Sequence, residues 1–437
     1  MFLEDLFWFY LDPVVVYSLC GVVFLIAFFC RSLLWQFFSV LAVYYYFRDV
    51  DLLYWQYLAV TVLVLGVPFI RQFLVSFLVM KLFIVLKFLP QISETELAAI
   101  DSGDVWLEGD LFSGKPNLSK MREHPSDRLT KEEQAFLDGP VHTLCEMVDD
   151  WDVHQKRDFS KPVWDFIKKE GFFGLIIPKS YGGRAFSPSG CSAVIAKLSS
   201  RSSALGITVM VPNSLGPAEL LIHYGTKRQQ DHYLPRLAIG EDVPCFGLTE
   251  VNAGSDAGSL TSSGTLFKRK DGSIGIRLQF QKRWITLSAV STVIGLAFRC
   301  YDPEELLGKG TDLGITCALI SSKAKGVKLG NRHDPLGVPF VNAPFSGKNV
   351  EIGLSDVIGE EAGIGKGWRM LMECLAAGRG ISLPAASTGG AKMATRVSCT
   401  YTMLRKQFGV SVGKFEGVQD ALGEMAGLTY VMEAMRR

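Results

Sequence analysis

Residues 247–256, Gly-Leu-Thr-Glu-Val-Asn-Ala-Gly-Ser-Asp, place hydroxyls and glycines in a short run after an apolar stretch. Such a loop suits a flat cofactor that carries phosphates, because hydroxyls bond to a ring edge and glycines admit a close approach. A second segment, Trp284-Ile285-Thr286, adds a flat aromatic face and another hydroxyl. The two segments predict flavin chemistry. The alternative is that threonines at strand ends only close turns.

The first segment closely resembles the acyl-CoA dehydrogenase signature Thr-Glu-x-x-Ala-Gly-Ser-Asp, and the second occurs where that family has a matching element. The resemblance covers about residues 125–437 and is strongest over 211–413. It implies bound FAD, an acyl-CoA substrate and oxidation to the trans-2-enoyl-CoA, with Ser255 near both the pyrophosphate and the substrate. The FAD-lining residues that it implies are Phe246, Leu248, Thr249, Ser255, Trp284, Ile285 and Thr286.

Two later elements resemble further parts of the family pattern. Arg379, in Gly378-Arg379, matches an arginine that contacts the nucleotide end of acyl-CoA. Arg405 and Phe408 match an Arg-x-x-Phe-Gly element that reaches across a subunit interface to the neighbour's FAD, which implies a homo-oligomer. Without the resemblance, these arginines would be ordinary solvent-exposed residues.

The proton-abstracting base does not appear at either position that the family uses. One position directly precedes the matched arginine and is Gly378 here, and the other lies in a Glu-Gly pair downstream of the Arg-x-x-Phe-Gly element. Glu373 and Glu416 are interpreted as helix-face or capping charges. We expect that the catalytic glutamate lies beyond Arg437, so that this chain is C-terminally truncated and has little or no activity.

Composition excludes several other classes of protein. The net charge of +1 over 437 residues shows no basic excess for nucleic acid. The nine cysteines are scattered without a Cys-x-x-Cys pair, so we expect reduced thiols and no metal site. The apolar excess is concentrated in the first ninety residues, which argues against a polytopic transporter.

Three apolar runs, 14–30, 33–47 and 52–70, each approach the length of about 20 residues that crosses a bilayer. We expect two or three spans, with the positive residues after the third run on the cytoplasmic side. Residues 72–89 suit a helix that lies in the interface, and a further span is the alternative.

From residue 93 the sequence has an ordinary globular composition, and the expected fold class is α+β. Helices are predicted at 162–170, 187–200, 213–224 and 227–239, with Asn213 and Thr226 as caps of the last two and a capping box at Thr130–Glu133. Short strands are predicted at 245–248, 274–280, 284–287, 293–298, 313–320 and 327–329. Helical periodicity returns after 363, with Leu371, Val397 and Met403 among the candidates for a buried face. The predicted regions are 1–90 (membrane), 91–124 (linker), 125–242 (helical domain), 243–362 (β-barrel-like domain) and 363–437 (incomplete helical bundle).

The resulting prediction is a membrane-anchored, FAD-dependent oxidoreductase that acts on medium- or long-chain acyl-CoA in fatty-acid β-oxidation. It resembles the long membrane-associated bacterial members of the family, which implies the inner membrane, a cytoplasmic catalytic part and an electron-transfer flavoprotein or similar acceptor. The alternatives are an acyl-CoA oxidase and a noncatalytic membrane-bound acyl-CoA-binding or assembly protein.

Overall fold

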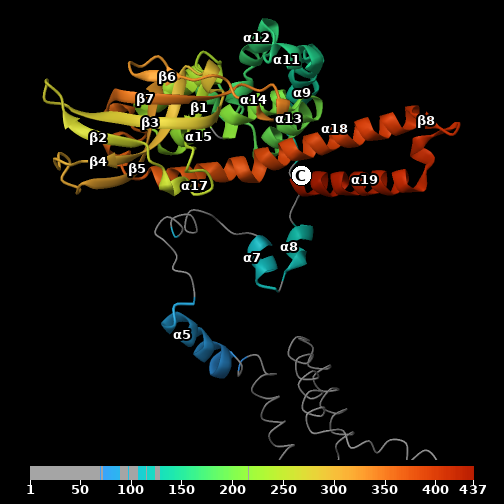
Figure 1. Cartoon of the computed structure of the whole chain (residues 1–437), viewed down its shortest axis with the longest axis horizontal. Coiled ribbons are helices and arrows are strands. Elements are labelled where there is room, and N and C mark those ends of the chain that lie inside the picture. Colours follow the sequence, from blue (N-terminus) through green and yellow to red (C-terminus); the bar gives the residue numbers. More distant parts are fainter. Residues whose placement is uncertain are drawn as a thin grey trace, which may run out of the picture. The chain divides into compact units, whose positions relative to one another are not determined.

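The computed structural model describes residues 72–88, 107–114, 116–123, 128–214 and 216–437, together with Phe69 and Leu97. The chain divides into two units, Met1–Ile92 and Ser93–Arg437 (Figure 1). Apart from Phe69, the three apolar runs that predict membrane spans lie outside the described residues.

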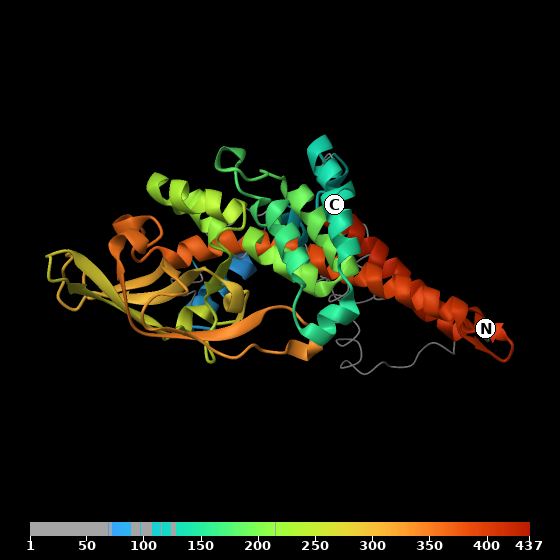
Figure 2. The same ribbon diagram turned by 90° about the horizontal axis from the view of Figure 1, so that it is seen from above.

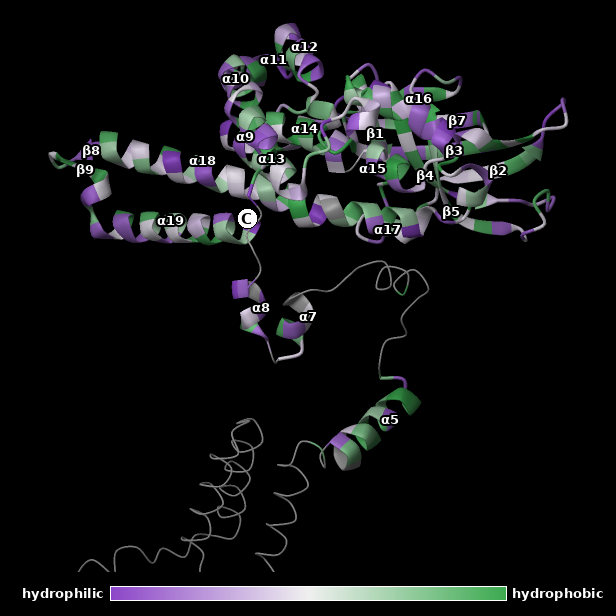
Figure 3. Ribbon diagram, turned by 180° about the vertical axis from the view of Figure 1, so that it is seen from behind, coloured by the Kyte–Doolittle hydropathy of each residue, from purple (hydrophilic) through white to green (hydrophobic). Residues whose placement is uncertain are grey.

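The described part of the first unit is helical. A π-helical turn, Gln72–Ser76, leads into α5, Phe77–Val85, which ends where Lys87 adopts a positive φ of 54°. Its side chains are apolar on all sides and exposed, with Lys81 as the charged exception (Figure 3). The helix therefore lacks the opposed polar and apolar faces of a helix that lies half in water.

The second unit begins with helices whose limits follow their capping residues. Thr130 and Glu133 form the predicted capping box at the start of α9, and Gly139-Pro140 separates α9 from α10. Thr226 and Gln229 form a second capping box at the start of α16. The helices are α7 Leu107–Phe112, α8 Leu118–Glu123, α9 Lys131–Asp138, α10 Pro140–Met147, α11 Asp150–Lys156, α12 Lys161–Lys169, α13 Pro188–Arg201, α14 Ser203–Ser214, α15 Pro217–Tyr224 and α16 Lys227–Ala238.

The prediction that Asn213 caps a helix over 213–224 is wrong. Asn213 lies at the end of α14, and α15 begins only after Gly216. The buried Asn213 side chain accepts a hydrogen bond from the Leu175 backbone N–H at 2.8 Å and donates to the Phe172 carbonyl at 2.7 Å. Long-range hydrogen bonds, which spacing along the chain does not reveal, thus decide its role.

The stretch Ser203–Tyr224 is, among the described residues, the one long and apolar enough to cross a membrane, and 82% of its apolar window is buried inside the protein. Burial of this kind is typical of a core helix.

A seven-stranded sheet follows, in the order β1-β4-β2-β3-β7-β6, with β5 paired to the other edge of β4. The sequence predicted β1, β4, β5 and β6, split β3 into two pieces and missed β2 and β7. The β3–β7 pairing is antiparallel and contains a register shift between Lys282 and Ile285. The strands are β1 Pro244–Gly247, β2 Ser263–Lys268, β3 Ile274–Thr286, β4 Val293–Tyr301, β5 Asp312–Ser321, β6 Val327–Leu329 and β7 Asn342–Gly353.

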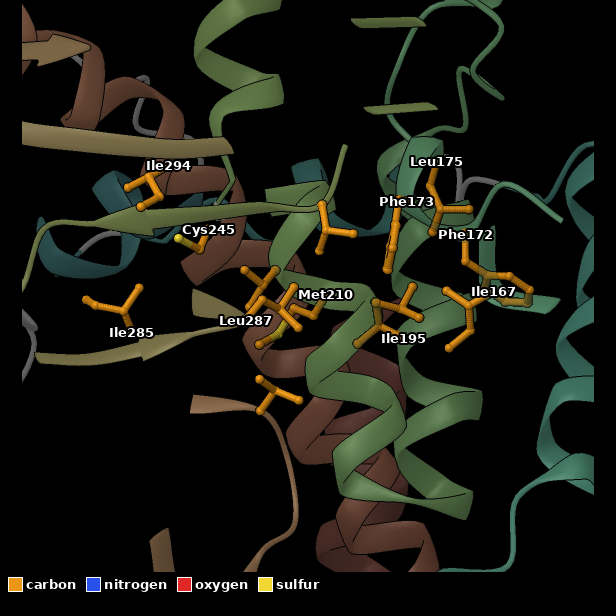
Figure 4. Close-up of a cluster of buried hydrophobic side chains, with 14 of the residues drawn as sticks. Ile167, Phe172, Phe173, Leu175, Ile195, Met210, Cys245, Ile285, Leu287 and Ile294 are labelled. Atoms are coloured by element: carbon orange, nitrogen blue, oxygen red, sulfur yellow. The ribbon is translucent and has the colours of Figure 1, made fainter. Parts of the chain in front are cut away.

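The hydrophobic core joins the helices to the sheet. Figure 4 shows Phe172, Phe173 and Ile195 from the helical part in one cluster with Cys245 and Ile285 from the strands. This shared core fixes the strand ends that carry the predicted cofactor residues relative to the helices that precede them.

The chain ends in long helices: α17 Gly367–Ala377, a π-helical segment Gly378–Ser382, α18 Leu383–Leu404 and α19 Glu416–Arg436, with a hairpin of β8 Lys406–Gln407 and β9 Val410–Ser411 between the last two. Figures 1 and 2 show α18 and α19 side by side. Leu371 is buried as expected, but Val397 and Met403 are 60% and 73% exposed. The expectation of a buried face along the outer half of α18 is wrong for this chain, because α19 covers only one side of it.

Candidate functional site

The two segments that predict flavin chemistry meet in space. The Arg283 backbone N–H donates to the Thr249 carbonyl at 3.1 Å, and the Lys282 ammonium donates to the Leu248 carbonyl at 2.9 Å. Residues 34 positions apart are therefore held together at the end of β1. The loop 249–255 and the strand end 284–286 form one surface.

A buried ion pair fixes this junction. Glu250 accepts hydrogen bonds from the Lys282 ammonium at 2.8 Å, the Ser262 hydroxyl at 2.5 Å and the Thr261 backbone N–H at 2.7 Å. Lys282 is fully buried. Gly247 leaves room for Phe345 and Lys282, because a Cβ there would lie 2.5 Å from the phenylalanine Cζ and 3.2 Å from the lysine Cγ. The motif glutamate thus fastens the loop internally, and its charge is already paired.

The pKa values of this pair follow from burial and from their mutual bond. Burial by itself would raise the pKa of Glu250, but the hydrogen bonds from Lys282 and Ser262 outweigh it and hold that pKa at about 2. Burial lowers the pKa of Lys282, and the bond to Glu250 offsets part of the effect. Neither residue was among the site residues predicted from the sequence, although Glu250 belongs to the motif.

The register shift in β3 turns Trp284 out of the sheet. Trp284 has a positive φ of 59°, and its side chain is 50% exposed. A β-bulge next to a site commonly redirects a side chain in this way. The Arg283 guanidinium carbon lies 5.3 Å from the centre of the indole ring. The half-exposed indole therefore offers aromatic surface at the end of β3.

Thr286 ends β3 beside Trp284 and is held from β7. Asn342 pairs with Thr286 in the strand register, and its side-chain nitrogen donates to the Thr286 hydroxyl oxygen at 3.3 Å. The Asn342 side-chain oxygen lies 2.7 Å from Nδ1 of His333. Neither residue was predicted from the sequence, because neither lies in a recognisable motif.

The residues present fit a flavin nucleotide. In the described part of the chain, the hydroxyls of Thr249 and Ser255 make no hydrogen bond, so both remain available to a ligand. A Cβ added at Gly254 would meet no atom within 4 Å, so the loop is open there. Because Lys282 neutralises Glu250, the motif carboxylate does not repel phosphate. The donor set, an aromatic face and an open loop suit the group that the sequence predicts.

Three of the predicted lining residues offer less side-chain surface to a ligand than Ser255 and Trp284 do. Ile285 is 4% exposed and belongs to the core shown in Figure 4, so only its backbone can face a ligand. The Phe246 ring covers Gly295, where a Cβ would come within 2.5 Å of it. Leu248 is half-buried against the second hydrophobic cluster.

The predicted arginines lie apart from one another. Arg379 is exposed in the π-helical segment at the start of α18, and Arg405 directly follows the other end of that helix. A helix of 22 residues separates them by about 33 Å. Figure 1 places β8 at the end of α18 that points away from the sheet. Arg405 and Phe408, which is 95% exposed, therefore lie outside the surface formed by Thr249 and Trp284 in the same chain.

A large cavity of about 1120 Å³ lies elsewhere, among α9, α13, α18 and α19. Its lining includes Arg128, Lys131, Lys392, Glu433 and Arg436, and none of the predicted cofactor residues. Volume alone favours this cavity as a ligand site. We give more weight to the strand-end surface, because its free hydroxyls and aromatic face match a defined chemistry.

Comparison with known proteins gives a consistent result. Models of the acyl-CoA dehydrogenase N-terminal, middle and C-terminal domains match residues 130–241, 245–350 and 365–437. A 3-(aryl)acrylate reductase from Clostridium sporogenes is 34% identical over 294 residues, which cover 66% of this chain and 72% of that protein. The very long-chain specific acyl-CoA dehydrogenase of Homo sapiens mitochondria is 27% identical, over 74% of this chain and 49% of that protein.

Solved structures share the fold. An acyl-CoA dehydrogenase from Bacillus anthracis, crystallised with FAD, superposes with a TM-score of 0.63 at 22% identity, over 72% of this chain and 51% of that one. This chain thus spans about half the length of the human and Bacillus anthracis proteins. The α+β layout of helical, β and helical parts that was predicted from the sequence is confirmed.

Proposed function

The chain belongs to the acyl-CoA dehydrogenase family, whose cofactor is FAD, and on this premise we propose that it oxidises a medium- or long-chain acyl-CoA to the trans-2-enoyl-CoA. The observation that carries the proposal is the junction of the Thr249 loop with the Trp284–Thr286 strand end, held by the Arg283–Thr249 hydrogen bond. Both chemical requirements of a flavin site, ring-edge donors and a flat face, are met on one surface.

The cofactor, when bound, supplies the acceptor for the hydride that leaves the substrate. The hydroxyls of Thr249 and Thr286 bind the ring edge, and the indole of Trp284 packs against the ring. Ser255, on the open loop, contacts the pyrophosphate and the substrate. Phe246, Leu248 and Ile285 hold the surface through the sheet and through their backbone, and Arg379 binds the nucleotide end of acyl-CoA.

One of the two positions that the family uses for the base supplies none in this chain. Gly378 occupies the position before Arg379 and has no side chain to accept a proton. We propose that the chain binds FAD and acyl-CoA and that residue 378 does not take the α-proton. The C-terminal family model matches residues 365–437, a range that includes Arg379 and Arg405.

The proposed partners are acyl-CoA, membrane lipid, an electron-transfer flavoprotein or similar acceptor, and a second copy of the chain, whose Arg405 and Phe408 would complete the FAD site. Both side chains are exposed at the tip of α18, as a contact with another subunit requires. The proposed location is the bacterial inner membrane with the catalytic part in the cytoplasm. The apolar α5, exposed on all sides, supports the membrane part of this proposal.

An anaerobic titration tests the activity. The purified chain, loaded with FAD, should show a yellow flavin spectrum that acyl-CoA bleaches. A chain that folds but binds no FAD would refute the function.

The same preparation separates the alternatives. Hydrogen peroxide formed on reoxidation by oxygen would indicate an oxidase, and binding of acyl-CoA without any bleaching would indicate the noncatalytic protein. Because one relative is named a 3-(aryl)acrylate reductase, reoxidation of the reduced flavin by a 2-enoate should also be measured.

A further inference from the structure

We propose that His333 and Asn342 are positioning residues that fix the direction of the hydrogen bond made by the Thr286 hydroxyl, so that Thr286 donates its proton outward to the flavin. This inference rests on the proposed binding of FAD beside Thr286. It adds two residues to the site, both from outside the motifs, and it assigns a donor where the sequence shows only a hydroxyl.

The side chains of His333, Asn342 and Thr286 form a continuous chain of hydrogen bonds, which we call the relay. Nδ1 of His333 lies 2.7 Å from the side-chain oxygen of Asn342, and the side-chain nitrogen of Asn342 lies 3.3 Å from the hydroxyl oxygen of Thr286. Asn342 is 5% exposed and stands opposite Thr286 across the β3–β7 pairing. The relay therefore runs from a half-buried imidazole, through a buried amide, to the cofactor surface.

The chemistry of the amide sets the polarity of this relay. An amide oxygen can only accept a hydrogen bond, so Nδ1 of His333 must carry the proton. An amide nitrogen can only donate, so the Thr286 oxygen must accept from Asn342. The hydroxyl proton of Thr286 then remains for a different acceptor. The unprotonated nitrogen at the centre of an oxidised flavin ring is such an acceptor.

The backbone keeps His333 in place for this role. The His333 N–H donates to the Asn342 carbonyl at 2.8 Å, so the two residues are joined twice. On either side of His333, Arg332 pairs with Asp158 at 3.2 Å and Asp334 pairs with Arg157, which ties the segment to the helical part. The Trp284 ring centre lies 6.5 Å from that of His333. The imidazole is thus held between the helices and the aromatic face of the site.

Asn342→Asp reverses the relay with little change in shape. A carboxylate accepts from both neighbours, so Thr286 must turn its proton toward residue 342 and away from the flavin. We expect FAD affinity to fall by about 3- to 10-fold, as for the loss of one hydrogen bond. We also expect the flavin absorption bands to shift as they do in Thr286→Val. Thr286→Ser, in the otherwise wild-type chain, should leave the FAD affinity and the flavin bands nearly unchanged, because the hydroxyl is kept.

The direct test is ¹⁵N NMR of the full chain with labelled histidine, with and without FAD. His333, assigned by its loss in His333→Gln, should show the tautomer protonated at Nδ1. In Asn342→Leu, which leaves Nδ1 without its acceptor, that preference should disappear. His142→Gln, on an exposed face of α10, is the matched control and should change neither the His333 signal nor the flavin spectrum.

These outcomes distinguish a failure of the proposed relay from a failure of the proposed FAD-dependent function. A wild-type chain that binds no FAD would refute the proposed function. A chain that binds FAD, but has His333 protonated at Nε2 or an unchanged flavin spectrum and affinity in Asn342→Asp, would overturn the relay alone. Thermal unfolding is measured for each variant, including His333→Gln, which replaces a half-buried side chain. A variant that unfolds at the wild-type temperature has lost the relay and kept the fold.

Discussion

Among the single residues, a few buried polar groups hold the site together, and the cofactor motif does not reveal this role. Glu250 belongs to the motif, yet its carboxylate faces inward to Lys282, Ser262 and Thr261. The residues left to meet a ligand are Thr249, Ser255 and the Trp284–Thr286 strand end. The buried pair therefore shapes the loop, and the proposed cofactor contacts are left to the remaining hydroxyls and the indole.

Replacing one partner of the buried Glu250–Lys282 pair should lower the free energy of unfolding. Lys282→Met leaves the Glu250 carboxylate buried without its counter-charge, so we expect the free energy of unfolding to fall by about 3–5 kcal/mol. Adding Glu250→Gln removes that isolated charge, and the double variant should lose less than the sum of the two single variants. Urea unfolding of the four proteins measures this coupling. Strictly additive losses would show that the two side chains do not interact.

The same carboxylate predicts a dependence on pH. Glu250 has a pKa of about 2 in the folded protein, against 4.5 as the ordinary value. Its stabilising contribution is thus complete above pH 4.5 and is lost as the pH falls toward 2, by about 3 kcal/mol in all. Between pH 7 and pH 3, the wild type should lose more stability than Glu250→Gln, as measured by urea midpoints. An equal loss in both proteins would contradict the assignment.

At the scale of elements, the strands that the sequence missed are the ones that complete the site. β7 carries Asn342, and β2 continues from the Thr261–Ser262 segment that binds Glu250. Both strands contain glycine or polar residues that weaken the alternating pattern, for example Ser346-Gly347-Lys348 in β7. The cofactor loop, the strand end 284–286 and the capped helices could be predicted, because their signals are local. Hydrogen bonds between strands that are far apart in the sequence have no local sequence pattern, so they could not be predicted.

Asn213 tests the role of long-range hydrogen bonds in the helical part. Asn213→Leu keeps the volume but leaves the Leu175 N–H and the Phe172 carbonyl buried without a partner. We expect a loss of about 2–4 kcal/mol in unfolding free energy. The exposed Asn331→Leu is the matched control and should lie within about 0.5 kcal/mol of wild type. A similar small effect at both positions would show that Asn213 does not anchor these segments.

At the scale of the whole molecule, the chain joins a strongly apolar first unit to a second unit with the acyl-CoA dehydrogenase fold. The family and its cofactor, predicted from two short motifs, are confirmed. The membrane spans stay a prediction, because they lie almost wholly outside the described residues. The apolar α5 is the structural feature that bears on them, since its side chains are exposed on all sides.

Chemical labelling tests the environment of α5. If α5 lies among lipid chains, as we propose, Leu82→Cys in native membranes should be protected from a membrane-impermeant maleimide. The same cysteine should react once the membrane is dissolved under denaturing conditions. Lys156→Cys, on the exposed face of α11, should react in both states. Mass spectrometry of the two peptides gives the extent of labelling. Equal reactivity of both cysteines in membranes would place α5 in water.

We propose that the Thr249 loop and the Trp284–Thr286 strand end bind one flavin ring. FAD titration of Trp284→Phe against Trp151→Phe tests it most directly, because both indoles are well exposed and only Trp284 lies on the proposed surface. We predict that FAD quenches the tryptophan fluorescence of the wild type and of Trp151→Phe, and that Trp284→Phe loses most of that quenching and shifts the flavin spectrum. Undiminished quenching and an unchanged flavin spectrum in Trp284→Phe would show that the flavin does not bind beside Trp284.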